Sequence, residues 1–96
     1  MRVISLNVNG IRSAERRGLS HWLARGTPWD VVCLQEIKAG LDDVPARMRA
    51  PRRAYSAFHP AERKGYAGVA LYARAPGTVV RGFGDDEFDR EGRYVE

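Results

Sequence analysis

LQEIK, residues 34–38, is the stretch that decides the fold of this chain, together with NVNG at residues 7–10. Each stretch closes a short apolar run with an oxygen-bearing polar side chain, Glu36 in the first and Asn7 in the second. An apolar run that ends in this way is typical of a buried strand that stops at the edge of a sheet. The sequence therefore predicts two strands that carry polar groups at their ends.

The segment between these two strands has the pattern of a helix. Residues 2–8 and 30–36 are predicted strands, and residues 11–25 are predicted to form one helix, with Ser13 as a candidate N-cap. A Gly-Thr-Pro stretch at residues 26–28 ends that helix. Because a strand, a helix and a strand in this order usually give two parallel neighbours, we expect an α/β fold.

The second half of the chain has a weaker pattern. We expect a short helix around residues 44–48, strands over residues 54–59, 67–74 and 79–83, and the opening of a further strand at Tyr94. The sequence ends there without a polar tail. We therefore expect residues 1–96 to be the N-terminal portion of one domain, incomplete in itself and without an internal boundary.

Composition narrows the class of protein. The formal net charge is +4, and residues 1–53 carry ten Lys and Arg against five Asp and Glu. This balance fits either a polyanionic partner such as nucleic acid or a solvated basic face. The one cysteine, Cys33, excludes an intrachain disulfide and is expected to be a small buried residue. Without a signal peptide or a membrane-spanning run, we expect a soluble cytoplasmic protein with no membrane partner.

The polar strand ends predict a site for a hard divalent cation. Because the carboxyl ends of parallel neighbours meet at one edge of a sheet, Asn7 and Glu36 are expected to converge there. A carboxylate and an amide oxygen suit Mg²⁺ or Mn²⁺ rather than Zn²⁺. Two plainer interpretations stay open: Glu36 forms an ion pair with Lys38, and Asn7 shapes the turn before Gly10. No GxGxxG, Walker or HExxH motif and no nucleophile triad is present in the sequence.

Four short segments, in order along the chain, resemble the exonuclease III / apurinic-apyrimidinic (AP) endonuclease branch of the endonuclease–exonuclease–phosphatase superfamily. They are NVNGIR at residues 7–12, LQEIK at 34–38, GYAGVA at 65–70 and EGR at 91–93. Each segment alone is weak evidence for this resemblance, whereas all four in the order of the family are specific to it. The resemblance implies the N-terminal part of a four-layered α/β sandwich, in which two packed mixed sheets lie between outer helices.

The resemblance also implies an activity and a set of site residues. The activity is hydrolysis of phosphodiester bonds in double-stranded DNA, dependent on Mg²⁺ or Mn²⁺, at abasic sites or from 3′ ends, as in base excision repair. The implied metal ligands are Glu36 and Asn7, with Lys38 and Asn9 beside them. The residues implied to contact the DNA backbone are Arg12, Lys38, Gly65, Tyr66 and Arg93, and we expect the arginines of residues 47–53 to add to this grip.

The resemblance places the family's catalytic tyrosine, its Asp-x-Asn segment, its later Asp and its Asp-His pair beyond residue 96. We therefore expect no catalytic residue in this chain, little cleavage by the chain alone, and a monomer at full length. Two alternatives remain: a non-catalytic DNA-binding fragment from a truncated reading frame, and a phosphatase branch of the same superfamily. The acidic run over residues 85–91 is expected to be a solvated loop rather than a calcium site.

Overall fold

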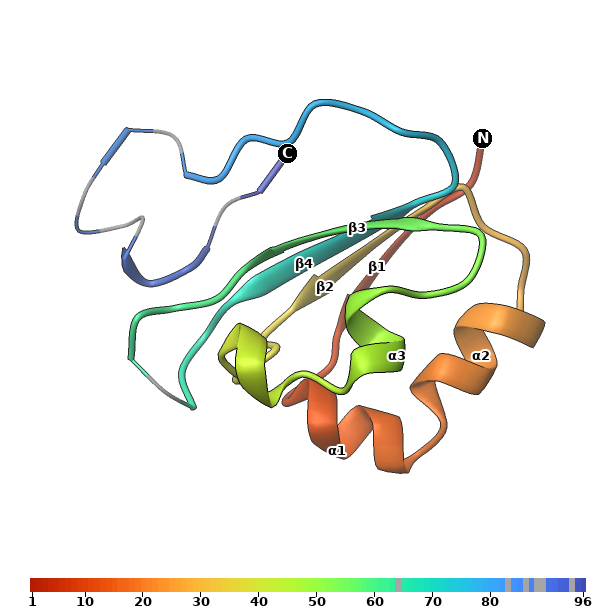
Figure 1. Ribbon diagram of the computed structural model, residues 1–96, viewed down its shortest axis with the longest axis horizontal. Coiled ribbons are helices and arrows are strands. Elements are labelled where there is room, and N and C mark those ends of the chain that lie inside the picture. The colour runs from red at the N-terminus through yellow and green to blue at the C-terminus, as the bar shows by residue number, and fades with distance from the viewer. Residues whose placement is uncertain (64, 83, 86, 88–89, 94) are drawn as a thin grey trace.

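The computed structural model describes residues 1–63, 65–82, 84–85, 87, 90–93 and 95–96. Its elements, in chain order, are β1 (Val3–Asn7), α1 (Ile11–Arg16), α2 (Leu19–Arg25), β2 (Val31–Gln35), the 3-10 helix η1 (Leu41–Asp43), α3 (Ala46–Arg49), β3 (Tyr55–His59) and β4 (Val69–Ala73). The strands form one sheet in the order β1-β2-β4-β3. Helices α1, α2 and α3 lie on one side of this sheet, and the residues that follow β4 run along its other side (Figure 1).

Strand pairing sets the two predicted strand ends side by side. Strand β1 is parallel to β2, with Asn7 opposite Gln35, and β4 is antiparallel to both of its neighbours, β2 and β3. A mixed sheet covered by helices is the α/β fold that the sequence predicted. Four predicted strands are confirmed, those at residues 2–8, 30–36, 54–59 and 67–74.

The hydrophobic core lies between the sheet and the helices. Val32 and Leu34 of β2 and Tyr72 of β4 are fully buried, because alternate residues of a strand point to the same face. The helical side of this core consists of Ile11, Leu19, Leu23, Val44 and Met48. The Tyr72 hydroxyl donates a hydrogen bond to the carbonyl oxygen of Met48 at 2.5 Å. This contact anchors α3 to the middle of the sheet.

The prediction of one helix over residues 11–25 is wrong. Helices α1 and α2 are separated at Gly18, whose φ of +101° is a left-handed conformation that glycine adopts freely. The second helix is capped from the first, since the Glu15 carboxylate accepts hydrogen bonds from the Ser20 N–H at 2.8 Å and the Ser20 hydroxyl at 2.6 Å. In the described part of the chain, no helix is long and apolar enough to cross a membrane.

Two further helical predictions need adjustment. Ser13 is not the cap of α1: Gly10 holds the N-cap position, and the first N–H, that of Ile11, donates to the carbonyl oxygen of Ile37 at 2.8 Å. The contact with the chain after β2 thus replaces a local cap. The short helix expected around residues 44–48 is present as α3, which begins two residues later.

No strand forms over the described part of residues 79–83. Arg81 makes an isolated antiparallel bridge with Val95 instead. Two positions of these predictions, Phe83 and Tyr94, lie outside the described residues. The bridge, with the backbone hydrogen bonds between Val80 and Glu96, holds the last residues of the chain against residues 80–81.

The second face of the sheet is partly open. Cys33 lies on it and is half-buried, which corrects the expectation of a core residue, because Val32 and Leu34 on either side take the helical face. A cavity of about 190 Å³ separates this face from Arg93 and Val95. The chain after β4 therefore brings its residues toward the carboxyl end of β2.

Candidate functional site

The two predicted strand-end side chains are in contact. Asn7 is the last residue of β1, and its Nδ2 donates a hydrogen bond to Oε2 of Glu36, which follows β2 directly. The Asn7 Oδ1 accepts a hydrogen bond from the N–H of Asn9 at 3.0 Å. Both groups lie at one edge of the sheet because β1 and β2 run parallel and in register. The structure thus brings an amide and a carboxylate together.

The backbone at Glu36 is held in a conformation that side-chain-bearing residues seldom adopt. Glu36 and Lys38 have φ values of +55° and +54°, which typically costs about 1–3 kcal/mol per residue. Contacts from two other segments hold them: the Gly10 N–H donates to the Glu36 carbonyl at 2.7 Å, and the Lys38 N–H donates to the Ala67 carbonyl at 2.8 Å. Strained backbone of this kind is concentrated at functional sites.

Gly68 allows the GYAGVA segment to approach the end of β2. A Cβ at this position would lie 2.7 Å from Cγ1 of Ile37, and the φ of Gly68 is +83°. The Ile37 N–H donates to the Gly68 carbonyl at 3.1 Å. The glycine is therefore required by both the close approach and the backbone conformation.

Lys38 completes the polar cluster around Glu36. Its Nζ donates to Oδ1 of Asn9 at 2.5 Å and lies 3.5 Å from Oε1 of Glu36. The hydrogen bond from Asn7, followed by the charge and hydrogen bond of Lys38, holds the pKa of Glu36 below its usual value. The carboxylate is therefore charged at neutral pH, and its side chain remains 44% exposed, so a ligand can reach it. The Glu36–Lys38 ion pair coexists with the Asn7 contact.

Tyr66 and Arg93 form a second polar cluster together with Glu91. Arg93 donates from Nη2 to the Tyr66 hydroxyl at 2.8 Å and from Nε to Oε1 of Glu91 at 2.7 Å. Its guanidinium carbon lies 5.3 Å from the centre of the Tyr66 ring. The Arg93 hydrogen bond lowers the pKa of Glu91, and the charge of Arg93 also contributes to lowering that of Glu36. The two clusters are thus electrostatically coupled.

Glu91 is a residue whose role the sequence analysis missed. It was grouped with the acidic run expected to be a solvated loop, whereas it orients Arg93. The available signal was its position in EGR, immediately before Gly92. That glycine has a φ of +64° and fits against the backbone of Pro60 and Ala61, where a Cβ would collide.

The other predicted DNA-contacting residues share one pocket. Arg12, Lys38 and Gly65 line an open depression of about 490 Å³ beside the end of β2. Arg16 lines it as well, one helical turn after Arg12. Sequence reasoning missed Arg16, although its spacing from Arg12 was a usable signal.

The arginines of residues 47–53 do not gather at this edge. Arg47 forms an ion pair with Glu15 on α1. Arg52 and Arg53 line a different pocket, which includes Arg74 after β4. Since β4 runs antiparallel to β2, its end lies at the opposite edge of the sheet from Glu36. The structure therefore separates this cluster from the site to which it was expected to contribute.

Residues 4–95 match the Endonuclease/Exonuclease/phosphatase family. The chain is 34% identical to "DNA repair nuclease APEX1" of Danio rerio, covering 99% of this chain and 31% of that protein. It is 33% identical to "Exodeoxyribonuclease" of Bacillus subtilis, covering 99% of this chain and 37% of that protein. The chain thus spans about a third of the length of the curated relatives it matches.

Solved structures agree with these sequence relatives. The catalytic domain of Xenopus laevis APE2 superposes with a TM-score of 0.81 at 29% identity, covering 99% of this chain and 38% of that one. The 3′-5′ exonuclease NExo of Neisseria meningitidis gives a TM-score of 0.80 at 27% identity, covering 99% and 36%. The chain therefore belongs to the endonuclease/exonuclease/phosphatase family, among the relatives of exonuclease III and the AP endonucleases.

Proposed function

We propose that this chain supplies the metal-holding carboxylate and part of the DNA-backbone contacts of a divalent-metal-dependent phosphodiesterase that acts on double-stranded DNA at abasic sites or 3′ ends. The observation that carries the proposal is the contact between Asn7 and Glu36 at the carboxyl edge of two parallel strands. The relatives named as a DNA repair nuclease and as an exodeoxyribonuclease support it. Under this proposal, these residues form part of an active site and do not carry out the whole reaction by themselves.

The donor atoms at this edge fit Mg²⁺ or Mn²⁺. Glu36 offers an ionised and accessible carboxylate, and Oδ1 of Asn7 retains a second lone pair beside its bond to Asn9. Among the described residues, no group of three His, Cys, Asp or Glu side chains gathers as it would at a zinc cage. Mg²⁺ commonly takes only one or two carboxylates and keeps waters and phosphate oxygens as its other ligands.

The roles of the side chains around Glu36 follow from their contacts. When bound, the divalent ion would stabilise negative charge on the phosphate oxygens. Glu36 would hold that ion, while Asn7 fixes the orientation of the carboxylate through its Nδ2. Lys38, held by Asn9, places a positive charge next to the carboxylate, where it would attract the phosphate.

Two groups flank this edge and would hold the DNA backbone. Arg93, braced by Tyr66 and Glu91, presents a guanidinium whose position is set before DNA arrives. The pocket that contains Arg12 and Lys38 offers further positive charge. Phosphate contacts of this kind position the duplex without reading its sequence.

The test uses the full protein that carries this chain, abasic duplex DNA and Mg²⁺. Glu36→Gln keeps the size of the side chain and removes its charge, so cleavage should fall by more than the roughly 10–100-fold that loss of a supporting partner costs. The matched control is Glu87→Gln, an equal change at an exposed position, which should leave the rate unchanged.

Each outcome separates the candidate functions. Near-normal cleavage by Glu36→Gln would overturn the assignment of this carboxylate. Salt-dependent DNA binding without any cleavage by the wild-type protein would favour a DNA-binding role instead. Hydrolysis of an inositol phosphate in place of abasic DNA would favour a phosphatase.

A further inference from the structure

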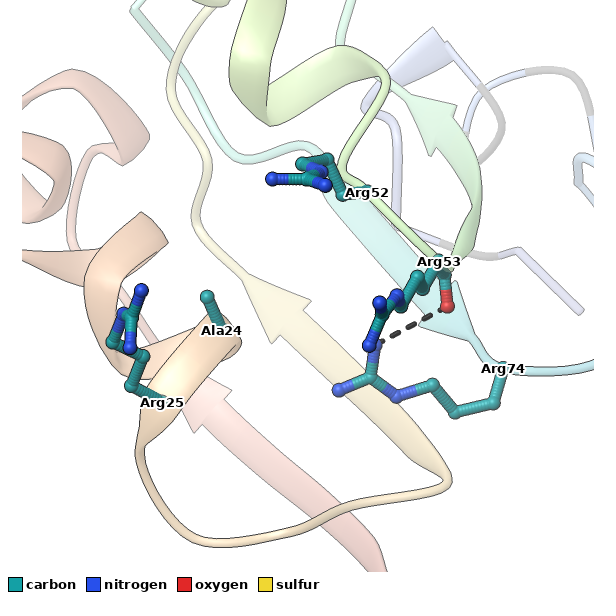
Figure 2. Close-up of a pocket in the computed structure, with 5 residues that line it drawn as sticks. All are labelled: Ala24, Arg25, Arg52, Arg53 and Arg74. Atoms are coloured by element: carbon teal, nitrogen blue, oxygen red, sulfur yellow. Dashed lines mark hydrogen bonds between the residues drawn. The ribbon is translucent and has the colours of Figure 1, made fainter.

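A second basic pocket lies at the far end of the sheet from Glu36. Its volume is about 510 Å³, and it is lined by Ala24, Arg25, Arg52, Arg53 and Arg74. These residues come from α2, from the loop before β3 and from the end of β4. Figure 2 shows Ala24 and Arg25 on one side of the opening and the other three arginines on the other side. The length of β2 and its flanking residues separates this pocket from Glu36 by about 20 Å.

Arg74 is fixed in place before any ligand binds. Its guanidinium lies 3.6 Å from the centre of the Trp29 ring, and its Nε donates to the Trp29 carbonyl at 3.4 Å. Its Nη1 donates to the carbonyl oxygen of Arg53 at 3.2 Å, a bond that Figure 2 draws. Trp29 is itself buried and donates from Nε1 to the carbonyl of Leu23 at 3.0 Å. Arg74 therefore presents a positive charge to the pocket from a position that these contacts set.

The charge of this pocket is uncompensated. Within the described residues, none of its arginines forms an ion pair with a carboxylate. The four arginines place four formal positive charges around one opening, in a chain whose formal net charge is +4. Like charges gathered around one cavity destabilise the fold, and a bound anion would relieve their repulsion.

The backbone adds a second sign of a ligand site. Arg53 has a φ of +59°, a strained conformation for a residue with a side chain. The carbonyl oxygen of this strained residue accepts the hydrogen bond from Arg74 at the wall of the pocket. The repulsion among the arginines and the backbone strain at Arg53 both disfavour the folded chain without a ligand, and both occur at this pocket.

We propose that this pocket binds a ligand carrying two or more neighbouring phosphate groups, independently of the Asn7–Glu36 edge. Its volume lies within the range of about 300–1,000 Å³ that is typical of ligand pockets. Guanidinium groups pair with phosphate oxygens through two parallel hydrogen bonds, and four of them can satisfy more than one phosphate. Neighbouring phosphate groups occur both in a free diphosphate and in the backbone of a nucleic-acid strand. The experiment distinguishes these two sources.

The experiment measures binding of inorganic pyrophosphate to the full chain by calorimetry in metal-free buffer with EDTA. The double variant Arg25→Gln/Arg52→Gln removes two exposed charges from the pocket and should raise the Kd at least tenfold. The control Arg49→Gln removes an exposed charge from α3, outside the pocket, and should change the Kd less than twofold. Because Arg74 stacks on Trp29, binding should also change the fluorescence of Trp29 in a Trp22→Phe background.

The outcomes decide the proposal and keep it separate from the proposed function. Absence of saturable binding, or an equal loss in Arg49→Gln, would overturn it. Glu36→Gln should bind pyrophosphate as the wild type does, and a loss there would place the ligand at the other edge and also overturn it. A single-stranded oligonucleotide that displaces pyrophosphate identifies a strand backbone as the source, whereas pyrophosphate binding that the oligonucleotide leaves intact identifies a free diphosphate.

Discussion

The amide nitrogen of Asn7 is hydrogen-bonded to the carboxylate of Glu36, although 29 residues separate the two in sequence. The bond forms because β1 and β2 are parallel, so that both strands end at one edge of the sheet. It is also the main influence that lowers the pKa of Glu36. One side chain thus fixes both the direction and the ionisation of the carboxylate at the candidate site.

Asn7→Ala is expected to weaken binding of Mn²⁺ by about 10–100-fold, the usual effect of losing a partner that orients a metal ligand. The measurement is calorimetric titration of the full protein with Mn²⁺. Ser5→Ala is the control, since Ser5 lies on the same strand and contacts Gln35 rather than Glu36. Equal Mn²⁺ affinities in Asn7→Ala and the wild type would contradict the role of Asn7.

Gly68→Ala is expected to destabilise the fold by about 1–3 kcal/mol, because the new Cβ overlaps the Ile37 side chain and the backbone is left-handed. Urea unfolding followed by circular dichroism measures the change. Gly77→Ala is the matched control, as a Cβ there meets nothing within 4 Å. If the two variants unfold at the same urea concentration, the close packing at Gly68 is not what stabilises this end of the sheet.

Ser20→Ala should make the protein less stable at neutral pH and reduce its sensitivity to acid. Burial opposes ionisation of Glu15, but the hydrogen bonds from Ser20, followed by Arg47, outweigh it and lower the pKa of Glu15. A lowered folded-state pKa stabilises the fold above the unfolded value of about 4.3, and this stabilisation is lost as the pH falls through the folded value.

The Ser20→Ala variant should therefore lose about 1–2 kcal/mol at pH 7, and its difference from the wild type should shrink below about pH 4. Urea unfolding at several pH values measures both effects. Ser13→Ala serves as the control, because Ser13 contacts Arg17 and not Glu15. A difference that stays constant down to pH 2 would contradict the linkage to Glu15.

Tyr72→Phe should cost about 1–3 kcal/mol at pH 7, because it leaves the buried Met48 carbonyl without its hydrogen-bond donor. At alkaline pH the difference in stability between the two proteins should shrink. Burial raises the pKa of Tyr72, so its contribution to stability is present below the unfolded value of about 10 and is lost as the pH rises toward the folded value. Unfolding curves from pH 7 to 11 should converge for the two proteins, and parallel curves would contradict this.

Arg93→Gln and Tyr66→Phe should weaken DNA binding in different ways. Loss of the Arg93 charge is expected to reduce the slope of log affinity against log salt by about one unit. Tyr66→Phe removes the hydroxyl that accepts the Arg93 hydrogen bond but no charge, so affinity should fall while the slope stays the same. Fluorescence anisotropy with abasic duplex at several salt concentrations measures both, and identical slopes for all three proteins would contradict a phosphate contact by Arg93.

The local pattern of apolar residues was sufficient to predict a strand wherever buried and partly exposed residues alternate regularly. The strands with a strong apolar pattern, such as residues 30–36, form where the sequence predicts them. In the part of residues 79–83 that the structure describes, the weak pattern gives a bridge at Arg81 rather than a strand, because a strand exists only when another strand pairs with it. The sequence pattern does not reveal whether a partner strand lies next to a given segment in the folded protein.

The site shows the same division. The sequence predicted Asn7, Glu36 and Lys38 as site residues, because polar residues at the carboxyl ends of neighbouring parallel strands lie close together. It missed that Glu91 orients Arg93 and that α1 ends where Gly18 turns left-handed. Both depend on contacts that local periodicity does not contain.

By itself, the sequence determined the four strands that pair in the sheet and the polar groups that stand at the ends of β1 and β2, since strand periodicity and strand-end chemistry are local properties of the chain. Only the tertiary structure decided that Arg52 and Arg53 join Arg74 at the opposite edge from Glu36. The physical reason is that the antiparallel turn into β4 reverses the chain, so residues far apart in number meet through sheet geometry rather than through any repeat in the sequence.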